Sequence, residues 1–241
     1  MPGNVPGRAK GTMRRRSGWR PDVATGLAIM PEKASGAAPA FQDHADGTLE
    51  EMRAAAAACR RCDLYRDATQ VVFGEGERRA RVLLVGEQPG DREDLSGRPF
   101  VGPAGRFLDG CLEEAGIDRP DCYLTNAVKH FKFKPLGKRR IHEKPNAGEV
   151  RRCAWWLGGE IARIRPALLV TLGATATFAV LGKRYAVTAD RGRIVETQDG
   201  LPVLITIHPS ALLRGRGRPD ARQERERFVA ELRRIAPFLS R

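Results

Sequence analysis

The segment from Gly86 to Asp109, GEQPGDREDLSGRPFVGPAGRFLD, holds the densest set of side chains that could take part in chemistry. Glu87 and Asp91 supply carboxylates, and Phe100 supplies an aromatic face. A helix expected to begin at Pro103 would add free backbone amides. The segment therefore offers negative charge, hydrogen-bond donors and a stacking surface along one side of a prospective binding site. The same residue types also suit an ordinary strand-to-helix loop.

Two further polar residues each follow an apolar run. Asn126 comes after Tyr123-Leu124-Thr125, and His208 comes after the run 203–207. An amide can both donate and accept hydrogen bonds, and an imidazole can stabilise a developing negative charge. Taken alone, they are better interpreted as a turn or cap residue and as a packed histidine at a strand end, because lone polar residues at strand ends are common.

A Cys-x-x-Cys pair, Cys59 and Cys62, closes an alanine-rich helical stretch. Such a pair is typical of a zinc site, a redox pair or an iron–sulfur site. A four-ligand site needs two more soft donors, and the remaining cysteines are Cys111, Cys122 and Cys153.

The run from Lys129 to Arg152 carries nine lysines and arginines against two acids. Lys138, Arg139, Arg140 and His142 lie at its centre. A run of this kind is expected to be solvated and to attract phosphates.

Short apolar runs at 82–85, 123–125, 168–172 and 203–207 are rich in branched residues, as buried parallel strands are. Helical stretches at 104–115, 147–164, 174–181 and 221–239 alternate with them. The pattern predicts a three-layer α/β/α sandwich around a short, mainly parallel four-stranded sheet. Ligands of such sheets bind beyond the carboxyl ends of the strands, where Glu87, Asn126 and His208 fall.

The net charge and the distribution of apolar residues indicate the class of binding partner and the cellular compartment. Lysine and arginine number 42 against 29 acids, a formal charge of +13 that favours a polyanionic partner such as nucleic acid. Residues 1–46 are predicted to form a basic, disordered tail, and residues 47–241 the folded domain. No run of about 18 apolar residues occurs, so no membrane span is expected. The sequence therefore favours the cytosol, where thiols stay reduced.

The 86–109 segment resembles the first motif of the iron–sulfur uracil-DNA glycosylases, a family related to family 4. That motif runs Gly-Glu-Ala-Pro-Gly and then Gly-x-Pro-Phe-Val-Gly-x-Ala-Gly, and here Gln88 replaces its alanine. Three more segments match in order: TNAVK at 125–129, LGA at 172–174 and HPSALLR at 208–214. The resemblance spans about residues 49–239 and implies the fold of that family.

The resemblance implies roles in the excision of an extruded uracil. Phe100 would stack on the base, Asn126 would read its edge, and His208 would stabilise the departing anion at O2. Glu87 would stabilise the sugar cation or orient a nucleophile. The other expected substrate contacts are Gln88, Asp91 and Arg214, and the expected DNA contacts are Lys138, Arg139, Arg140 and Ser210.

In the family, the third cluster ligand follows the Asn-x-Val-Lys motif and the fourth precedes an aromatic helix. His130 stands at the third position, and Cys153 precedes Trp155-Trp156. The resemblance thus implies a 4Fe–4S cluster on Cys59, Cys62, His130 and Cys153, with zinc on the same set as the alternative.

Gln88 and the run Lys-Arg-Arg-Ile-His at 138–142 are the marks of the UdgX-type branch. In that branch the loop histidine becomes joined to deoxyribose C1′ after uracil departs, which implies this role for His142. We therefore expect a monomeric cytoplasmic protein of the bacterial nucleoid that traps uracil-containing DNA. The alternatives are an ordinary multiple-turnover glycosylase and a non-catalytic, zinc-braced nucleic-acid binding module.

Overall fold

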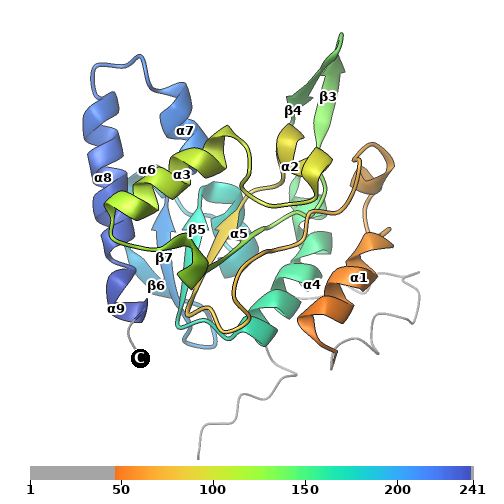
Figure 1. Ribbon diagram of the computed structural model, residues 1–241, viewed down its shortest axis with the longest axis horizontal. Helices are drawn as coiled ribbons and strands as arrows, with labels where there is room; N and C mark the ends of the chain where they lie inside the picture. Colours follow the sequence, from red (N-terminus) through yellow and green to blue (C-terminus); the bar gives the residue numbers. More distant parts are fainter. Residues whose placement is uncertain (1–46, 240–241) are drawn as a thin grey trace, which may run out of the picture.

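A five-stranded sheet forms the centre of the protein in a computed structural model that describes residues 47–239. Four parallel strands confirm the predicted runs: β1 (Val82–Gly86), β2 (Cys122–Asn126), β5 (Leu168–Leu172) and β7 (Pro202–Thr206). The order is β2-β1-β5-β7-β6, and Figure 1 shows the sheet between helices on either side. Because β1, β2 and β5 are buried throughout, they lack the apolar–polar alternation of half-exposed strands.

The predicted count of four strands is corrected to five. Strand β6 (Ile194–Glu196) pairs antiparallel with β7 at the edge of the sheet. Its three partly exposed residues give too short a pattern for detection in the sequence. A separate hairpin, β3 (Phe133–Leu136) and β4 (Arg139–His142), occupies the run that was expected to be a loop.

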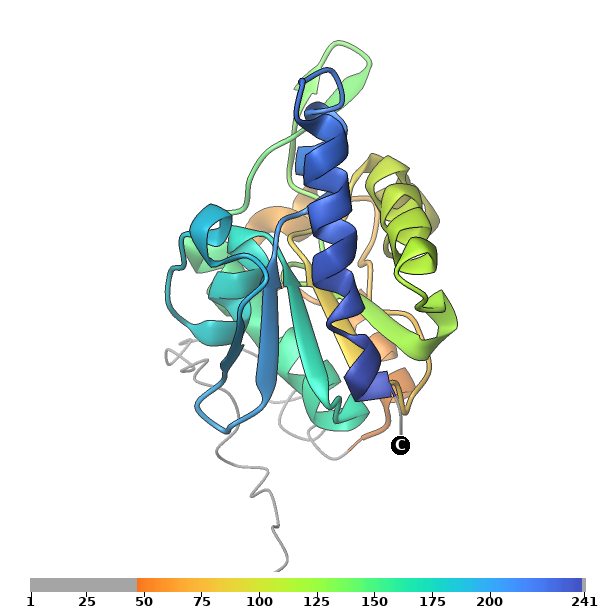
Figure 2. The same cartoon turned by 90° about the vertical axis from the view of Figure 1, so that its left-hand side faces the viewer.

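Helices cover both faces of the sheet and make the predicted three layers. One apolar core includes Leu83 and Val85, and the other includes Val82 and Leu84, since successive side chains of a strand point to opposite faces. The first core is closed by α1 (Leu49–Ala57), α4 (Ala147–Ile164) and α5 (Ala174–Leu181). The second is closed by α3 (Pro103–Glu114), α7 (Pro209–Arg214) and α8 (Ala221–Arg233), and Figure 2 shows α8 in front of the sheet, running roughly along the strands.

The remaining short helices are α2 (Asp91–Ser96), α6 (Val187–Asp190) and α9 (Ala236–Leu239), with 3-10 turns at Asp63–Arg66 and Arg119–Asp121. The helix expected from Ala221 to Leu239 is divided between α8 and α9. Pro237 lies just after this break and cannot donate a helical backbone hydrogen bond.

Two helices that flank the cysteines begin with strong caps. Thr48 and Glu51 form a reciprocal capping box at α1, and Asn146 and Glu149 form another at α4. These caps fix where α1 and α4 begin; α1 ends at Ala57, two residues before Cys59, and Cys153 lies on α4. The tail predicted at residues 1–46 lies outside the described residues. No helix among residues 47–239 is long and apolar enough to cross a membrane.

Candidate active site

Asn126 and Phe100 converge on Gly86 at the carboxyl end of β1. Gly86 pairs in register with Asn126 across the parallel strands. A Cβ placed on Gly86 would lie 2.3 Å from Asn126 Oδ1 and 2.7 Å from Phe100 Cζ. Such distances leave room only for glycine, so the amide and the ring meet over its backbone. The structure thus brings together the residues predicted to read and to stack on a base.

The backbone of Phe100 is held in an unusual conformation. Its φ of +57° lies in the left-handed region, which costs a non-glycine residue roughly 1–3 kcal/mol. Gly105 permits this turn, because a Cβ there would lie 1.7 Å from Phe100 O. Glu93 accepts a hydrogen bond from Gly102 N at 2.7 Å, and Arg119 Nη1 donates to Phe100 O at 3.5 Å. These contacts hold the ring in place.

Glu87 follows β1 and contacts the end of β4 and the first turn of α5. Its Oε1 lies 3.3 Å from His142 Nε2, and its Oε2 accepts a hydrogen bond from the Thr175 hydroxyl. Burial raises the pKa of the Glu87 carboxyl, but the hydrogen bonds from His142 and Thr175 outweigh burial and hold the pKa below its usual value. Glu87 is therefore an anion at neutral pH.

His208 faces the same site as a neutral imidazole. Burial lowers its pKa to about 4, although the negative charge of Glu87 acts in the opposite direction. Its Nδ1 accepts from Ser210 N at 3.2 Å, which places the ring proton on Nε2. Ser210 Oγ in turn accepts from Arg214 Nη1 at 3.1 Å. Ser210 and Arg214, predicted to contact DNA and substrate, thus also orient His208.

The hairpin β3–β4 carries His142 and projects beyond the carboxyl ends of the sheet (Figure 1). Gln88 bridges the base of this hairpin: its Nε2 donates to the carbonyl oxygens of Lys132 and Glu143, each at 3.0 Å, and its Oε1 accepts from Lys132 N at 3.2 Å. The structure therefore uses Gln88, predicted to bind substrate, to hold the loop that bears His142.

Arg140 fastens the hairpin to α2. Its Nε contacts Asp91 Oδ1 and its Nη1 contacts Asp94 Oδ2, each at 2.6 Å. Its guanidinium also lies 5.2 Å from the ring centroid of Phe133, in cation–π range. Arg140 and Asp91 were predicted to contact DNA and substrate, and the structure pairs them with each other. Lys138 and Arg139 are exposed at the hairpin tip.

The predicted metal ligands are all buried. Trp156 Nε1 donates to Cys59 Sγ, and Lys129 N donates to Cys153 Sγ, each at 3.2 Å. Burial, with a smaller effect of the neighbouring Cys62 and Cys59, raises the pKa of the Cys153 thiol to about 12. The three cysteines are thus buried thiols, and a bound cation would favour their thiolate forms.

His130 completes the predicted donor set. Burial, together with the positive charge of Arg60, lowers its pKa to about 4. The ring is therefore neutral, which is the form that ligates metals. Among residues 47–239, no three or more histidine, cysteine or acidic side chains are already arranged to hold a metal ion. What suits these four residues to a metal site is their donor types, their burial and the N–H groups that donate to sulfur.

Several residues of the site were not predicted from the sequence. They are Thr175, Glu93 and Asp94, which hold Glu87, the Phe100 turn and Arg140 respectively. Thr175 does follow the LGA motif, so its position after β5 was a usable signal. Glu93 and Asp94 are buried acids within α2, and nothing in their spacing separates them from solvated helix residues.

Comparison with known proteins gives a consistent result. Residues 73–233 match the model of the "Uracil DNA glycosylase superfamily". The Type-4 uracil-DNA glycosylase of Thermotoga maritima is 43% identical over 159 residues, which cover 66% of this chain and 79% of that protein. Its namesakes from Pyrobaculum aerophilum and Archaeoglobus fulgidus are 36% and 35% identical, over 71% and 70% of this chain and 86% and 83% of their own lengths.

Proposed function

The chain belongs to the uracil-DNA glycosylase superfamily, and from this premise we propose that it excises uracil from DNA and then becomes joined to the DNA through His142. The observation that carries the covalent step is the 3.3 Å approach of His142 Nε2 to Glu87 Oε1. A nucleophile at this position would stand beside the carboxylate that is proposed to face the sugar.

Recognition of the base rests on Asn126 and Phe100. A uracil extruded from the helix stacks on the Phe100 ring, while the Asn126 amide donates to O4 and accepts from N3–H. Cytosine presents the opposite polarity at these two positions and is rejected. The convergence of the two side chains over Gly86 supports this arrangement.

Bond cleavage separates charge between the base and the sugar. The C1′–N1 bond breaks and its electron pair leaves with uracil, whose anion accepts a hydrogen bond from neutral His208 at O2. The deoxyribose becomes an oxocarbenium-like cation, which the Glu87 carboxylate stabilises. The lowered pKa of Glu87 keeps that negative charge available at neutral pH.

The final step forms a bond to the protein. One imidazole nitrogen of His142 donates its lone pair to C1′, and the ring N–H proton is released, so a neutral N-alkylimidazole remains. This product has a poor leaving group and ends turnover. A denaturing gel of the protein with a uracil-containing single-stranded oligonucleotide tests the proposal. Retarded DNA supports it, whereas repeated release of uracil without retarded DNA supports the ordinary glycosylase, and no release supports the binding module.

Arg140 and its two ion pairs, with Asp91 and Asp94, form a clamp that should control the rate of the covalent step. Replacing Arg140 by glutamine frees the hairpin from Asp91 and Asp94, and we expect the rate of adduct formation to fall about 10- to 100-fold, as when a reacting group is misplaced by about 1 Å. Uracil release should change far less, because Glu87, Asn126 and His208 lie on other elements. Timed denaturing gels measure the first rate and free uracil the second. Arg139→Gln at the exposed tip is the control, and an unchanged adduct rate in Arg140→Gln would contradict the clamp.

We also propose that Cys59, Cys62, His130 and Cys153 hold a 4Fe–4S cluster. A cluster of this kind would brace α4 against the segment after β2, and no electron transfer is required of it. The buried cysteines, the neutral imidazole and the N–H donors to Cys59 and Cys153 support this assignment. Zinc on the same four residues is the alternative.

Purified protein should show broad visible absorbance at about 400 nm, which a zinc site lacks. Cys153→Ser should lose this absorbance and most of the iron measured by elemental analysis. Cys111→Ala is the matched control, because Cys111 is also buried but lies on α3, in the core on the other face of the sheet. Stoichiometric zinc with colourless protein would show that the cluster assignment is wrong.

A further inference from the structure

A buried ion pair lies directly behind Asn126. Lys129 Nζ and Glu160 Oε2 are 2.6 Å apart, and their side chains are 1% and 0% exposed. Lys129 follows β2 in sequence, whereas Glu160 lies on α4. Neither side chain takes part in the chemistry proposed above, so the pair calls for its own explanation.

The pair forms hydrogen bonds with the last residues of strand β2. Lys129 Nζ donates to Asn126 O at 2.8 Å and to Thr125 Oγ1 at 2.6 Å. Glu160 accepts from the Thr125 hydroxyl at 2.9 Å and from the Tyr123 hydroxyl at 3.1 Å. The pair thus contacts the main-chain carbonyl of Asn126 and the side chains of Thr125 and Tyr123, which precede Asn126 in β2.

Strand β2 needs such support because it is an edge strand. Within residues 47–239, only β1 pairs with it along its length, and its outer side is met by a single bridge between Leu124 and Glu75. Glu160 also accepts from Gly74 N at 2.9 Å, which draws the segment next to that bridge into the same network. The network therefore replaces the missing neighbour strand at the point where Asn126 ends β2.

Stability alone is a poor reason for a pair of this kind. Removing two charges from water costs several kcal/mol for each ion, and well-packed apolar residues of similar volume commonly stabilise a protein as much or more. What the pair adds is direction: Lys129 Nζ holds the main-chain carbonyl of Asn126, the residue whose side-chain amide would meet the base. Recognition of a base edge needs that amide to be held within about 10–20°.

We propose that Glu160 and Lys129 are positioning residues for uracil recognition, acting through Asn126. The inference rests on the proposed function, because it takes Asn126 as the group that reads the base. Neither residue touches the substrate. Loosening the pair should therefore weaken the binding of uracil without creating a new contact or removing a reacting group.

The test is the affinity for free uracil, measured as its inhibition constant in single-turnover excision. Glu160→Gln should weaken this affinity about tenfold, because the side-chain amide of Asn126 is no longer held in one orientation. The same substitution in an Asn126→Ala background should have no further effect, since the group through which Glu160 acts is already absent. A merely structural role would lower the melting temperature in both backgrounds without this coupling.

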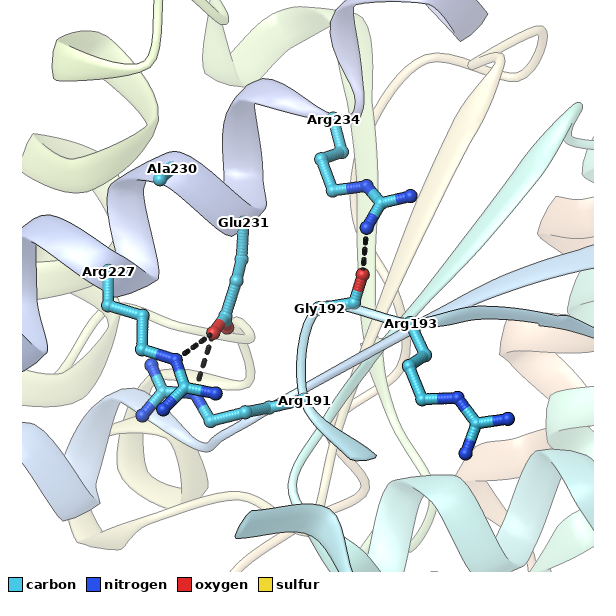
Figure 3. Close-up of a pocket in the computed structure, with 7 residues that line it drawn as sticks. All are labelled: Arg191, Gly192, Arg193, Arg227, Ala230, Glu231 and Arg234. Carbon is cyan, nitrogen blue, oxygen red and sulfur yellow. Dashed lines mark hydrogen bonds and ion pairs between the residues drawn. The ribbon is translucent and has the colours of Figure 1, made fainter. Parts of the chain in front are cut away.

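Glu231 offers a matched control. It is a buried carboxylate on α8 that contacts Arg191 Nε at 2.6 Å and Arg227 Nε at 3.3 Å. Figure 3 draws these contacts among the residues that line a shallow, open pocket. It also accepts from the Thr206 hydroxyl at the end of β7. Any effect of Glu231→Gln on uracil affinity should persist in the Asn126→Ala background, because Glu231 has no route through Asn126.

The outcomes separate the inference from the function on which it rests. If Glu160→Gln does not fold, Lys129→Met with Glu160→Gln leaves no unpaired buried charge and should show the same loss and the same coupling. Unchanged uracil affinity, or an equal loss with and without Asn126, would overturn the inference alone. A wild-type protein that neither binds nor releases uracil would overturn the proposed function and the inference together.

Discussion

Replacing His142 by alanine should abolish the denaturant-resistant adduct with uracil-containing DNA and leave uracil release in place. The substitution removes the nitrogen that would attack C1′, while Glu87, Asn126 and His208 remain. Water then takes the place of the imidazole at the sugar cation, and the enzyme is free to act again. Adduct should fall from about one per protein to none, and uracil released per protein should rise above one.

A gel and a uracil assay on the same reaction measure both quantities. Lys138→Ala is the control, because it removes a basic group from the exposed tip of the same hairpin and leaves the adduct. Persistence of the adduct in His142→Ala would mean that another residue is the nucleophile. Loss of uracil release along with the adduct would mean that His142 acts in cleavage and not after it.

Replacing Glu87 by glutamine should lower the single-turnover rate of uracil release by about 10²–10³-fold, the loss typical of removing one preorganised electrostatic contact from a transition state. Glutamine keeps the shape of the side chain and can still accept from Thr175, so the packing changes little. What disappears is the negative charge opposite the sugar cation. Adduct formation should slow in step with release, because cleavage precedes trapping.

This paired slowing distinguishes Glu87 from His142, whose loss should affect trapping alone. Glu226→Gln is the control: Glu226 is also a carboxylate that accepts a hydrogen bond from an arginine, Arg222 Nε at 2.8 Å, but it lies on α8, outside the elements that carry Glu87, Asn126 and His142. Release at the wild-type rate by Glu87→Gln would remove Glu87 from the mechanism. Rapid release with slow trapping would limit its role to orienting His142.

The main features of the fold could be predicted because they rest on local patterns. The runs at 82–85 and 168–172 have no competing interpretation, and parallel strands bring their carboxyl ends to one edge. The convergence of Glu87, Asn126 and His208 follows from that rule. The hairpin β3–β4 could not be predicted, because its strands have four residues each, most of them exposed, and Pro135 is unfavourable in a strand.

The supporting contacts of the site could not be predicted, because they join residues far apart in sequence. Arg140 meets Asp94, 46 residues away, and Thr175 meets Glu87, 88 residues away. A basic run gives no indication of which arginine will be clamped and which will stay exposed. Likewise, Lys129 was counted among the solvated basic residues, although it is one of the most buried side chains in the protein.

The central claim is that the imidazole of residue 142 stands beside the sugar carbon of an extruded uracil. Peptide mass mapping of protein incubated with a short uracil-containing oligonucleotide tests it most directly. We predict one modified peptide, which contains His142 and carries the mass of the abasic deoxyribose with its digested DNA. Modification of a different residue, or unmodified protein after complete release of uracil, would contradict the account.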